Sequence, residues 1–169
     1  MPVTNTSPAE KPAVQQLLRS FNNPWKMRLY YWQKIPSLLF WGVKIEHCTP
    51  ERAMVSVPFR WRTQNPFRST YFAALCGAAE LSTGVLAFVA LQGHSRVSML
   101  ITHIEADFVK KANGRTVFTC EEGDKIQRAV QQAIDTQTAQ TVRVTTIGRN
   151  AAAEVVAQAT LTWSFKLKA

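Results

Sequence analysis

The sequence predicts an α+β domain in which one antiparallel sheet of about six strands curls around a long buried helix. Residues 69–92 form an apolar run of helical length whose only charged side chain is Glu80. On both sides of this run, several segments alternate apolar and polar residues with a period of two, as half-buried strands do. A helix that is apolar on every side must be surrounded, and a curled sheet of such strands would surround it.

The length of 169 residues is enough for one domain without disulfides or a structural metal. We expect a flexible tail over residues 1–11 and one domain over residues 12–169, in which residues 12–41 form a helical N-terminal extension. The three cysteines are widely spaced and no apolar signal run opens the chain. Both features favour reduced thiols and a cytoplasmic location.

The formal net charge of +9 indicates an anionic partner. Nucleic acid, anionic lipid and phosphorylated small molecules all fit this charge. The basic residues are spread along the chain instead of forming a run or a known nucleic-acid-binding motif. This distribution argues against nucleic acid and suits a ligand that carries phosphates.

The N-terminal extension has the pattern of helices. Apolar residues within 14–21 recur at helical spacing after Pro12, and Asn23-Pro24 has the composition of a helix cap followed by a first helical position. Residues 25–41 then hold three of the five tryptophans beside basic residues. Such a segment can lie on a membrane surface, but we favour rings that cover the core or line an apolar pocket.

Six segments are expected to form strands. Residues 43–46 and 52–62 predict a hairpin, although Pro58 requires an edge position or a bulge. Residues 97–111 and 115–122 flank Asn113-Gly114, which predicts a second hairpin. Two closing strands follow, and they turn near residues 148–150.

A second helix is expected between the fourth and fifth strands. Asp124 is expected to be its N-cap, and apolar residues from Ile126 to Ile134 form one stripe. For the apolar run of residues 69–92, a transmembrane helix is the alternative interpretation. A carboxylate at its middle would be costly in hydrocarbon, so we favour the centre of a curled sheet.

This order of elements, with two local stretches, resembles the hotdog superfamily over about residues 40–168, specifically the phenylacetate-pathway (PaaI-like) acyl-CoA thioesterases. The first stretch has Asn65, a loop, Tyr71-Phe72-Ala73 at the family's His-Gly-Gly positions, and Glu80 nine residues after Tyr71. The second stretch, residues 107–114, is similar to the family's Asn-Phe-Leu-Arg-Pro-Ala-x-Gly.

The resemblance implies an acyl-CoA thioesterase that needs no cofactor, since CoA is part of the substrate. Glu80 would be the general base, amides near Tyr71 and Phe72 would donate to the oxyanion, and Asn65 would act from the neighbouring subunit. The further substrate contacts are expected at Ser69, Thr70, Ala73, Thr83, Phe108, Lys110 and Lys111.

Several residues have structural alternatives. Glu80 could instead pair with a Lys or Arg, or accept a hydrogen bond from Ser82, Thr83 or another chain. Asn65 could be a turn residue before Pro66. Ser69 or Thr70 is expected to cap the long helix, and Lys110 and Lys111 would either meet CoA phosphates or form a solvated face.

Two other functions remain open. Because the His-Gly-Gly positions are substituted, a noncatalytic acyl-CoA or fatty-acyl binding protein is the main alternative, and a basic protein for nucleic acid or membrane is the second. The resemblance implies a homodimer or a dimer of dimers. We expect no metal, because the three histidines lie far apart, and we disfavour a membrane partner.

Overall fold

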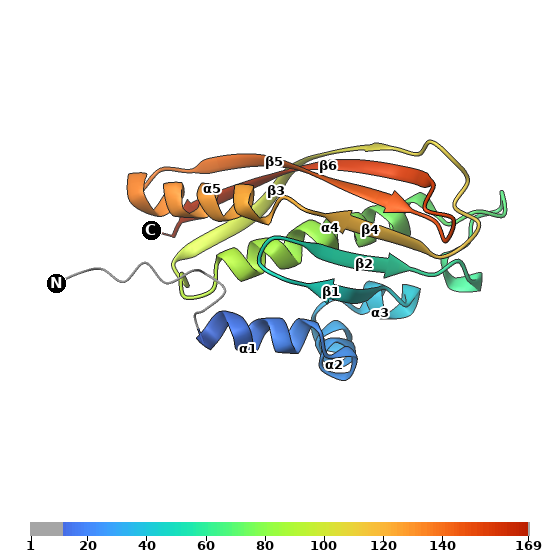
Figure 1. The fold of residues 1–169 in the computed structure, drawn as a ribbon, viewed down its shortest axis with the longest axis horizontal. Coiled ribbons are helices and arrows are strands. Elements are labelled where there is room, and N and C mark those ends of the chain that lie inside the picture. The colour runs from blue at the N-terminus through green and yellow to red at the C-terminus, as the bar shows by residue number, and fades with distance from the viewer. Residues whose placement is uncertain (1–11, 169) are drawn as a thin grey trace.

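The computed structural model describes residues 12–168, so the tail predicted over residues 1–11 lies outside the described residues. Figure 1 shows a sheet with a long helix along its concave side and three helices next to one sheet edge. The elements in chain order are α1 (Pro12–Phe21), α2 (Pro24–Lys34), α3 (Pro36–Trp41), β1 (Lys44–Cys48), β2 (Ala53–Val57), a 3-10 turn (Trp61–Thr63), α4 (Phe72–Ala90), β3 (Val97–Asp107), β4 (Thr116–Cys120), α5 (Gly123–Thr136), β5 (Gln140–Arg149) and β6 (Val155–Leu167).

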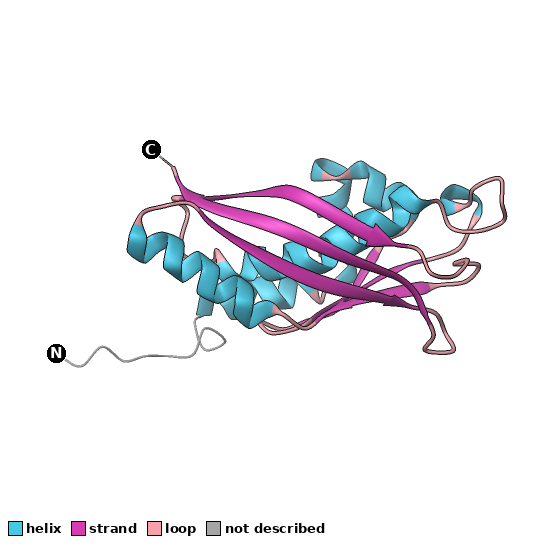
Figure 2. Cartoon of the chain, turned by 90° about the horizontal axis from the view of Figure 1, so that it is seen from above, coloured by secondary structure: helices cyan, strands magenta, loops and turns pink. Residues whose placement is uncertain are grey.

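All six strands form one antiparallel sheet in the order β1-β2-β4-β5-β6-β3. The sheet curls over α4, as the view from above shows (Figure 2). This is the hotdog fold that the sequence predicts. The strands at the two edges are β1 and β3, so each has one side without a partner strand in the chain.

Hydrogen bonds fix the rotation of α4 against the sheet. The hydroxyls of Ser82 and Thr146 lie 2.8 Å apart, and the Trp163 indole N–H donates to the Thr83 hydroxyl at 3.0 Å. By length and composition α4 could cross a membrane, but 61% of its most apolar window is buried inside the protein. It is therefore the core helix of the sheet.

Most predicted elements are confirmed. Asn23 caps α2, because its side chain accepts hydrogen bonds from the amides of Trp25 and Lys26, and Pro24 is the first helical residue. The β1–β2 hairpin is present. The predicted stripe of α5 is buried from Ile126 to Ala133, and the predicted face of β6 packs inward.

The hairpin predicted around Asn113-Gly114 is wrong. Strand β3 pairs with β6 over nearly its whole length, while β4 lies between β2 and β5. The segment after Asp107 is thus a crossing connection, and Gly114 does not have a positive φ. The long ladder with β6 outweighs the local turn signal.

The strand predicted over residues 52–62 is too long, since β2 ends at Val57. The reason is Pro58, which has no N–H to donate, whereas β2 is an interior strand with neighbours on both sides.

The predicted caps of the two later helices are also wrong. Tyr71 is the residue before α4 and Glu122 the residue before α5, and neither makes a side-chain cap. The Thr70 hydroxyl donates instead to the Ala112 carbonyl at 2.8 Å, and the Ser69 hydroxyl to the Asn65 side chain at 3.2 Å. Both residues anchor the loop before α4.

Candidate functional site

The face of α4 that the sheet leaves uncovered forms one wall of a cleft of about 550 Å³, which we call the Glu80 cleft. Helix α3 and Ile35, the residue before it, form the second wall, and edge strand β3 forms the third. The lining residues are Ile35, Ser37, Leu38, Trp41, Phe72, Ala73, Cys76, Gly77, Glu80, Leu81, Ile101 and Ile104. Glu80 thus carries the one carboxyl group among the residues that line this mostly apolar cleft.

The side-chain spacing on α4 produces this wall. Ala73, Cys76, Gly77, Glu80 and Leu81 follow one another at helical i, i+3, i+4, i+7 and i+8 positions, so they lie on one face. Gly77 permits a close approach, because a Cβ there would lie 3.0 Å from the Trp41 ring. Helix α3 is therefore held against the wall next to Glu80.

The apolar surroundings change the acidity of Glu80. Partial burial raises the pKa of its carboxyl above the usual range, since removal of water disfavours the charged form. More than a third of the residue remains exposed in the single chain. A carboxylate with a raised pKa and open access to solvent can accept a proton from water.

The structural alternatives for Glu80 are not found within residues 12–168. The Ser82 hydroxyl donates to the Ala79 carbonyl at 2.7 Å, and the Thr83 hydroxyl to the Glu80 main-chain carbonyl at 3.0 Å. Neither reaches the carboxylate, and none of the ion pairs among these residues includes Glu80. The carboxylate is thus available to a ligand or to another chain.

The first residues of α4 line the same cleft. The Tyr71 amide donates to the Thr63 carbonyl at 2.6 Å, so in this conformation it cannot serve as the predicted oxyanion donor. The amides of Phe72 and Ala73 have no acceptor among residues 12–168, and both residues line the cleft. The candidate oxyanion donors are therefore the amides of Phe72 and Ala73, which lie at the positive end of the helix dipole.

Asn65 organises the loop that precedes α4. Its side-chain oxygen accepts hydrogen bonds from the amides of Phe67 at 2.9 Å and Ser69 at 3.2 Å. In this loop Arg68 has a φ of 57°, the left-handed region that favours glycine. Asn65 thus stabilises the turn before α4, and its reach toward a partner subunit stays a prediction.

Aromatic rings gather at the start of α4. The ring centroids of Tyr71 and Phe72 lie 4.9 Å apart, and those of Phe72 and Phe108 lie 6.3 Å apart, in both pairs edge to face. The fold therefore brings together two predicted site residues that are far apart in sequence. This cluster flanks the free amides and offers an apolar surface to a ligand.

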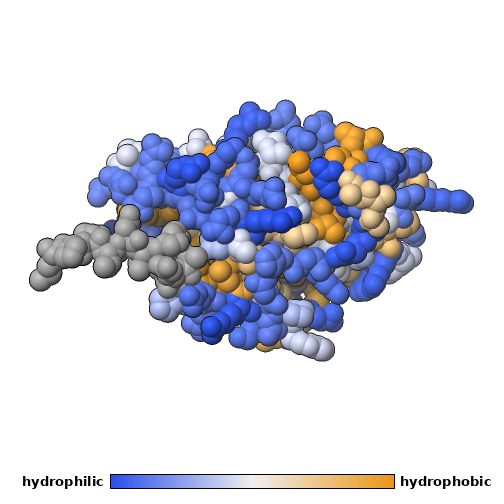
Figure 3. Space-filling view, viewed as in Figure 1, coloured by the Kyte–Doolittle hydropathy of each residue, from blue (hydrophilic) through white to orange (hydrophobic). Residues whose placement is uncertain are grey.

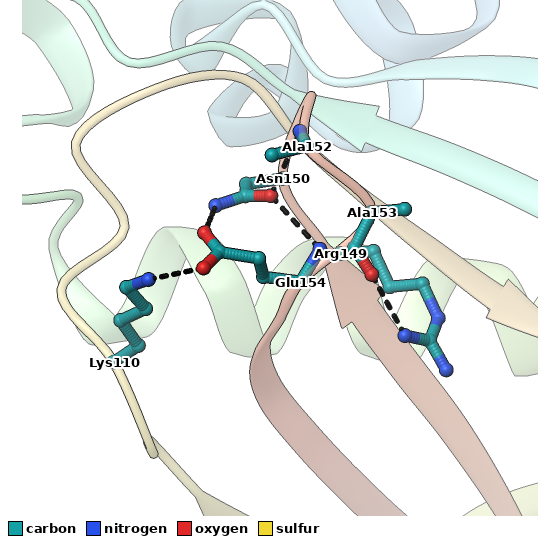
Figure 4. Close-up of polar contacts among 6 residues, drawn as sticks. All are labelled: Lys110, Arg149, Asn150, Ala152, Ala153 and Glu154. Carbon is teal, nitrogen blue, oxygen red and sulfur yellow. Dashed lines mark hydrogen bonds and ion pairs between the residues drawn. The ribbon is translucent and has the colours of Figure 1, made fainter.

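The two predicted CoA-binding lysines differ in their contacts. Lys110 lies 2.6 Å from Glu154, whose pKa it lowers, and Asn150 holds the other carboxylate oxygen at 2.7 Å (Figure 4). Lys110 thus ties the β5–β6 turn to the segment after β3. Lys111 is exposed and forms no ion pair within residues 12–168.

Sequence reasoning missed part of the cleft. Thr83, a predicted substrate contact, is buried and bonded to Trp163, so it supports the helix instead. Ile101 and Ile104 line the cleft from β3, which the mistaken hairpin could not indicate. Across the described part of the chain, no three His, Cys, Asp or Glu side chains come close enough to hold a metal ion.

A second hollow of about 260 Å³ continues the cleft along α4, and we call it the Phe88 hollow. Ile35 and Leu81 line both spaces, so these two side chains stand at the junction. The other lining residues are Leu17, Ser20, Phe21, Lys26, Met27, Tyr30, Val85 and Phe88. From Phe72 to Phe88 the two spaces follow about 24 Å of helix.

Comparison with protein families gives a match over residues 25–165 to a domain of unknown function, DUF4442. The chain belongs to the DUF4442 family. No curated protein sequence matches this DUF4442 chain. The matched residues include the sheet, α4 and the helices that line the cleft, but the family description names no activity.

Solved structures with the same fold are distant in sequence. A Pseudomonas aeruginosa protein of unknown function, described as a probable thioesterase, has a TM-score of 0.74 at 18% identity, covering 86% of this chain and 97% of its own. A Chlorobaculum tepidum protein of unknown function has 0.72 at 11%, with 89% and 99% covered. A thioesterase from Haemophilus influenzae has 0.63 at 11%, with 86% and 91% covered. At these identities the likeness shows a shared fold.

Proposed function

We propose that this DUF4442 protein hydrolyses acyl-CoA thioesters. The observation that carries the proposal is that the Glu80 carboxylate lies in the same apolar cleft as Phe72 and Ala73, and that neither this carboxylate nor the amides of those two residues have a polar partner among residues 12–168. These are the two groups that thioester hydrolysis needs, a base for water and donors for the oxyanion. The names of the Pseudomonas and Haemophilus neighbours support the same reaction.

In the proposed mechanism, the thioester carbonyl oxygen accepts hydrogen bonds from the Phe72 and Ala73 amides. Glu80 takes a proton from water as the water oxygen bonds to the carbonyl carbon. The helix dipole of α4 and the two amides stabilise the negative charge that develops on the carbonyl oxygen. When the carbon–sulfur bond breaks, the CoA sulfur leaves and recovers the proton from Glu80.

The spacing of these groups supports catalysis across two subunits. Ala73 and Glu80 are seven residues apart on α4, about 10 Å along its axis. A carbonyl group and an attacking water span that distance only when fully extended. We therefore propose that the clefts of two subunits join in a dimer, so that Glu80 of one subunit acts on a thioester held at the helix start of the other.

Edge strand β3 is the surface that we propose for this dimer. It has an unpaired side and carries the exposed apolar residues Leu100 and Ile104, and Ile104 also lines the Glu80 cleft. An exposed apolar edge invites pairing with another strand. Pairing of two β3 strands would close the cleft on the side that is open in the single chain.

The proposal is tested by a hydrolysis screen of the wild-type protein with short, long and aromatic acyl-CoAs, with thermal shifts recorded on the same samples. We expect turnover with at least one class. Stabilisation without turnover would instead identify a noncatalytic acyl-CoA binding protein. That second candidate is favoured by the engaged Tyr71 amide and by Phe72 and Ala73 at positions where relatives have glycine.

The junction between the cleft and the hollow gives a prediction about chain length. Replacement of Leu81 by Trp would close the junction, so an acyl chain could no longer pass from the Glu80 cleft into the Phe88 hollow. We expect kcat/KM for long-chain relative to short-chain acyl-CoA to fall by about 10- to 100-fold. Leu29→Trp, at an exposed leucine that lines neither space, is the control. An unchanged ratio in Leu81→Trp would contradict passage through the junction.

A further inference from the structure

Helix α2 has an apolar face that no part of the described chain covers. Met27 and Tyr31 are its buried residues. On the opposite side, Trp25 is 80% exposed, Leu29 57% and Trp32 66%. The face seen in Figure 3 is mostly hydrophilic, with apolar residues in separate patches, so two bare tryptophans on one short helix need a physical reason.

The exposed residues form an ordered stripe. Trp25, Arg28, Leu29 and Trp32 occupy positions i, i+3, i+4 and i+7, the spacing of one helix face. In most surface helices such a stripe packs on the core, but here it points to solvent. From the sequence we expect the aromatic rings of this segment to cover the core or line a pocket. This prediction holds for Tyr31 and Trp41, and in part for Trp25, which lines a small hollow although it is 80% exposed. It fails for Trp32, which is 66% exposed.

A basic cleft continues from this stripe. Arg28, Lys44, Arg60, Arg62 and Arg115 line a hollow of about 460 Å³ whose one carboxylate is Glu46. Glu46 is already occupied, because Arg115 contacts it at 2.7 Å and Ser56 donates to it at 2.5 Å. The other four cations take part in no ion pair within residues 12–168.

The stripe and the basic cleft are one continuous surface. Trp25, Arg28 and Lys44 line a small hollow together with Tyr31, and Arg28 and Lys44 also line the basic cleft. The Tyr31 hydroxyl is buried without a hydrogen-bond partner among the described residues. Beyond them, the Arg62 guanidinium lies 5.7 Å from the centre of the exposed Phe40 ring.

We propose that this surface docks on an anionic phospholipid membrane. Tryptophan and leucine on the outer face of a helix would enter the boundary between headgroups and acyl chains, as in interfacial helices. The cations of the basic cleft would meet lipid phosphates, and the net charge of +9 would attract the protein to a negative surface. This inference revises the expectation against a membrane partner.

A second copy of the chain fits this surface less well. In a two-fold contact the same patch meets itself, so the cations of the basic cleft would approach one another. The dimer proposed above uses β3, at the opposite edge of the sheet from β1 and Lys44. An anionic partner is therefore favoured by charge.

The docking inference does not depend on acyl-CoA hydrolysis. If the proposed function also holds, docking would place the Phe88 hollow near lipid, because Met27 and Tyr30 of α2 line that hollow.

The test is co-flotation of the full chain with vesicles of phosphatidylcholine alone or mixed equally with phosphatidylglycerol. We expect the wild type to bind the mixed vesicles, with a blue shift of tryptophan fluorescence, and to be released by salt. Trp25→Ala with Trp32→Ala should weaken partitioning by about 10-fold or more. Arg28→Gln with Arg62→Gln should weaken it by about 30-fold.

Matched controls change the same properties elsewhere. Phe67→Ala with Val109→Ala removes two exposed apolar residues. Arg128→Gln with Lys166→Gln removes two exposed charges that form no ion pair within residues 12–168. Both double variants should bind the mixed vesicles as the wild type does. The proposal would be overturned if the wild type did not bind the mixed vesicles, or if it bound a single-stranded oligonucleotide in place of vesicles. It would also be overturned if the protein did not bind lipid and the tryptophan variant formed a smaller oligomer than the wild type.

Discussion

Glu80→Gln is expected to reduce acyl-CoA turnover by about 10²- to 10⁴-fold while the protein stays folded. The amide keeps the size of the side chain but cannot accept a proton from water. The Glu80 carboxylate makes no ion pair or hydrogen bond among residues 12–168, so its loss removes no polar contact among these residues. The measurement is kcat with the best acyl-CoA from the screen, with thermal unfolding of the same sample.

The pH dependence of the wild type follows from the direction of the Glu80 pKa shift. Burial raises this pKa, so the reactive carboxylate form is lost as pH falls through a value above the usual glutamate range. The rate should therefore rise with pH through that window. The folded state binds the proton more tightly than the unfolded chain, so the stability contributed by this group falls as pH rises from the unfolded to the folded pKa. At neutral pH, Glu80→Gln should leave the stability unchanged or higher.

Asp124→Asn is the matched control, since it also converts a carboxylate to an amide, on the exposed first turn of α5. It should retain wild-type turnover. Full activity of Glu80→Gln with the same pH profile would remove Glu80 from the mechanism. The Phe72 and Ala73 amides would then support a binding role only.

The candidate site was predictable where it depends on local spacing. The offset of nine residues from Tyr71 to Glu80 placed the carboxylate and the helix start on one helix, and both lie in one cleft. Which amide is free was not predictable, because the Tyr71 amide is bound by Thr63, on the 3-10 turn. Such a contact depends on how the loop folds back on itself, and no local sequence pattern predicts it.

The strands were also predictable from local spacing, but the prediction of which strands pair was wrong for β3. Period-two alternation identified the strands, but it does not say which strands are neighbours. Asn113-Gly114 is a strong local hairpin signal, yet β3 crosses to the far edge of the sheet and pairs with β6. Ile101 and Ile104 reach the Glu80 cleft only because of that crossing.

Gly123→Ala is expected to destabilise the protein by about 3 kcal/mol, at the upper end of the cost of overpacking. A Cβ at this position would lie 2.0 Å from the Pro50 carbonyl oxygen and 2.7 Å from the Glu51 Cα. The Gly123 amide also donates to the Glu51 carbonyl at 3.0 Å, so the start of α5 cannot move away without losing that bond. Thermal unfolding at one fixed protein concentration should show a midpoint lower by about 6 to 12 °C.

Gly114→Ala is the matched control, and it also decides between the predicted hairpin and the observed connection. A Cβ at Gly114 meets no atom within 4 Å, and this glycine lacks a positive φ, so alanine should change the stability by less than about 1 kcal/mol. In the predicted two-residue hairpin turn, Gly114 would need a positive φ, and alanine there would be clearly destabilising. A large loss in Gly114→Ala with little effect in Gly123→Ala would therefore contradict both the path of residues 108–115 and the packing of α5 against the β1–β2 turn.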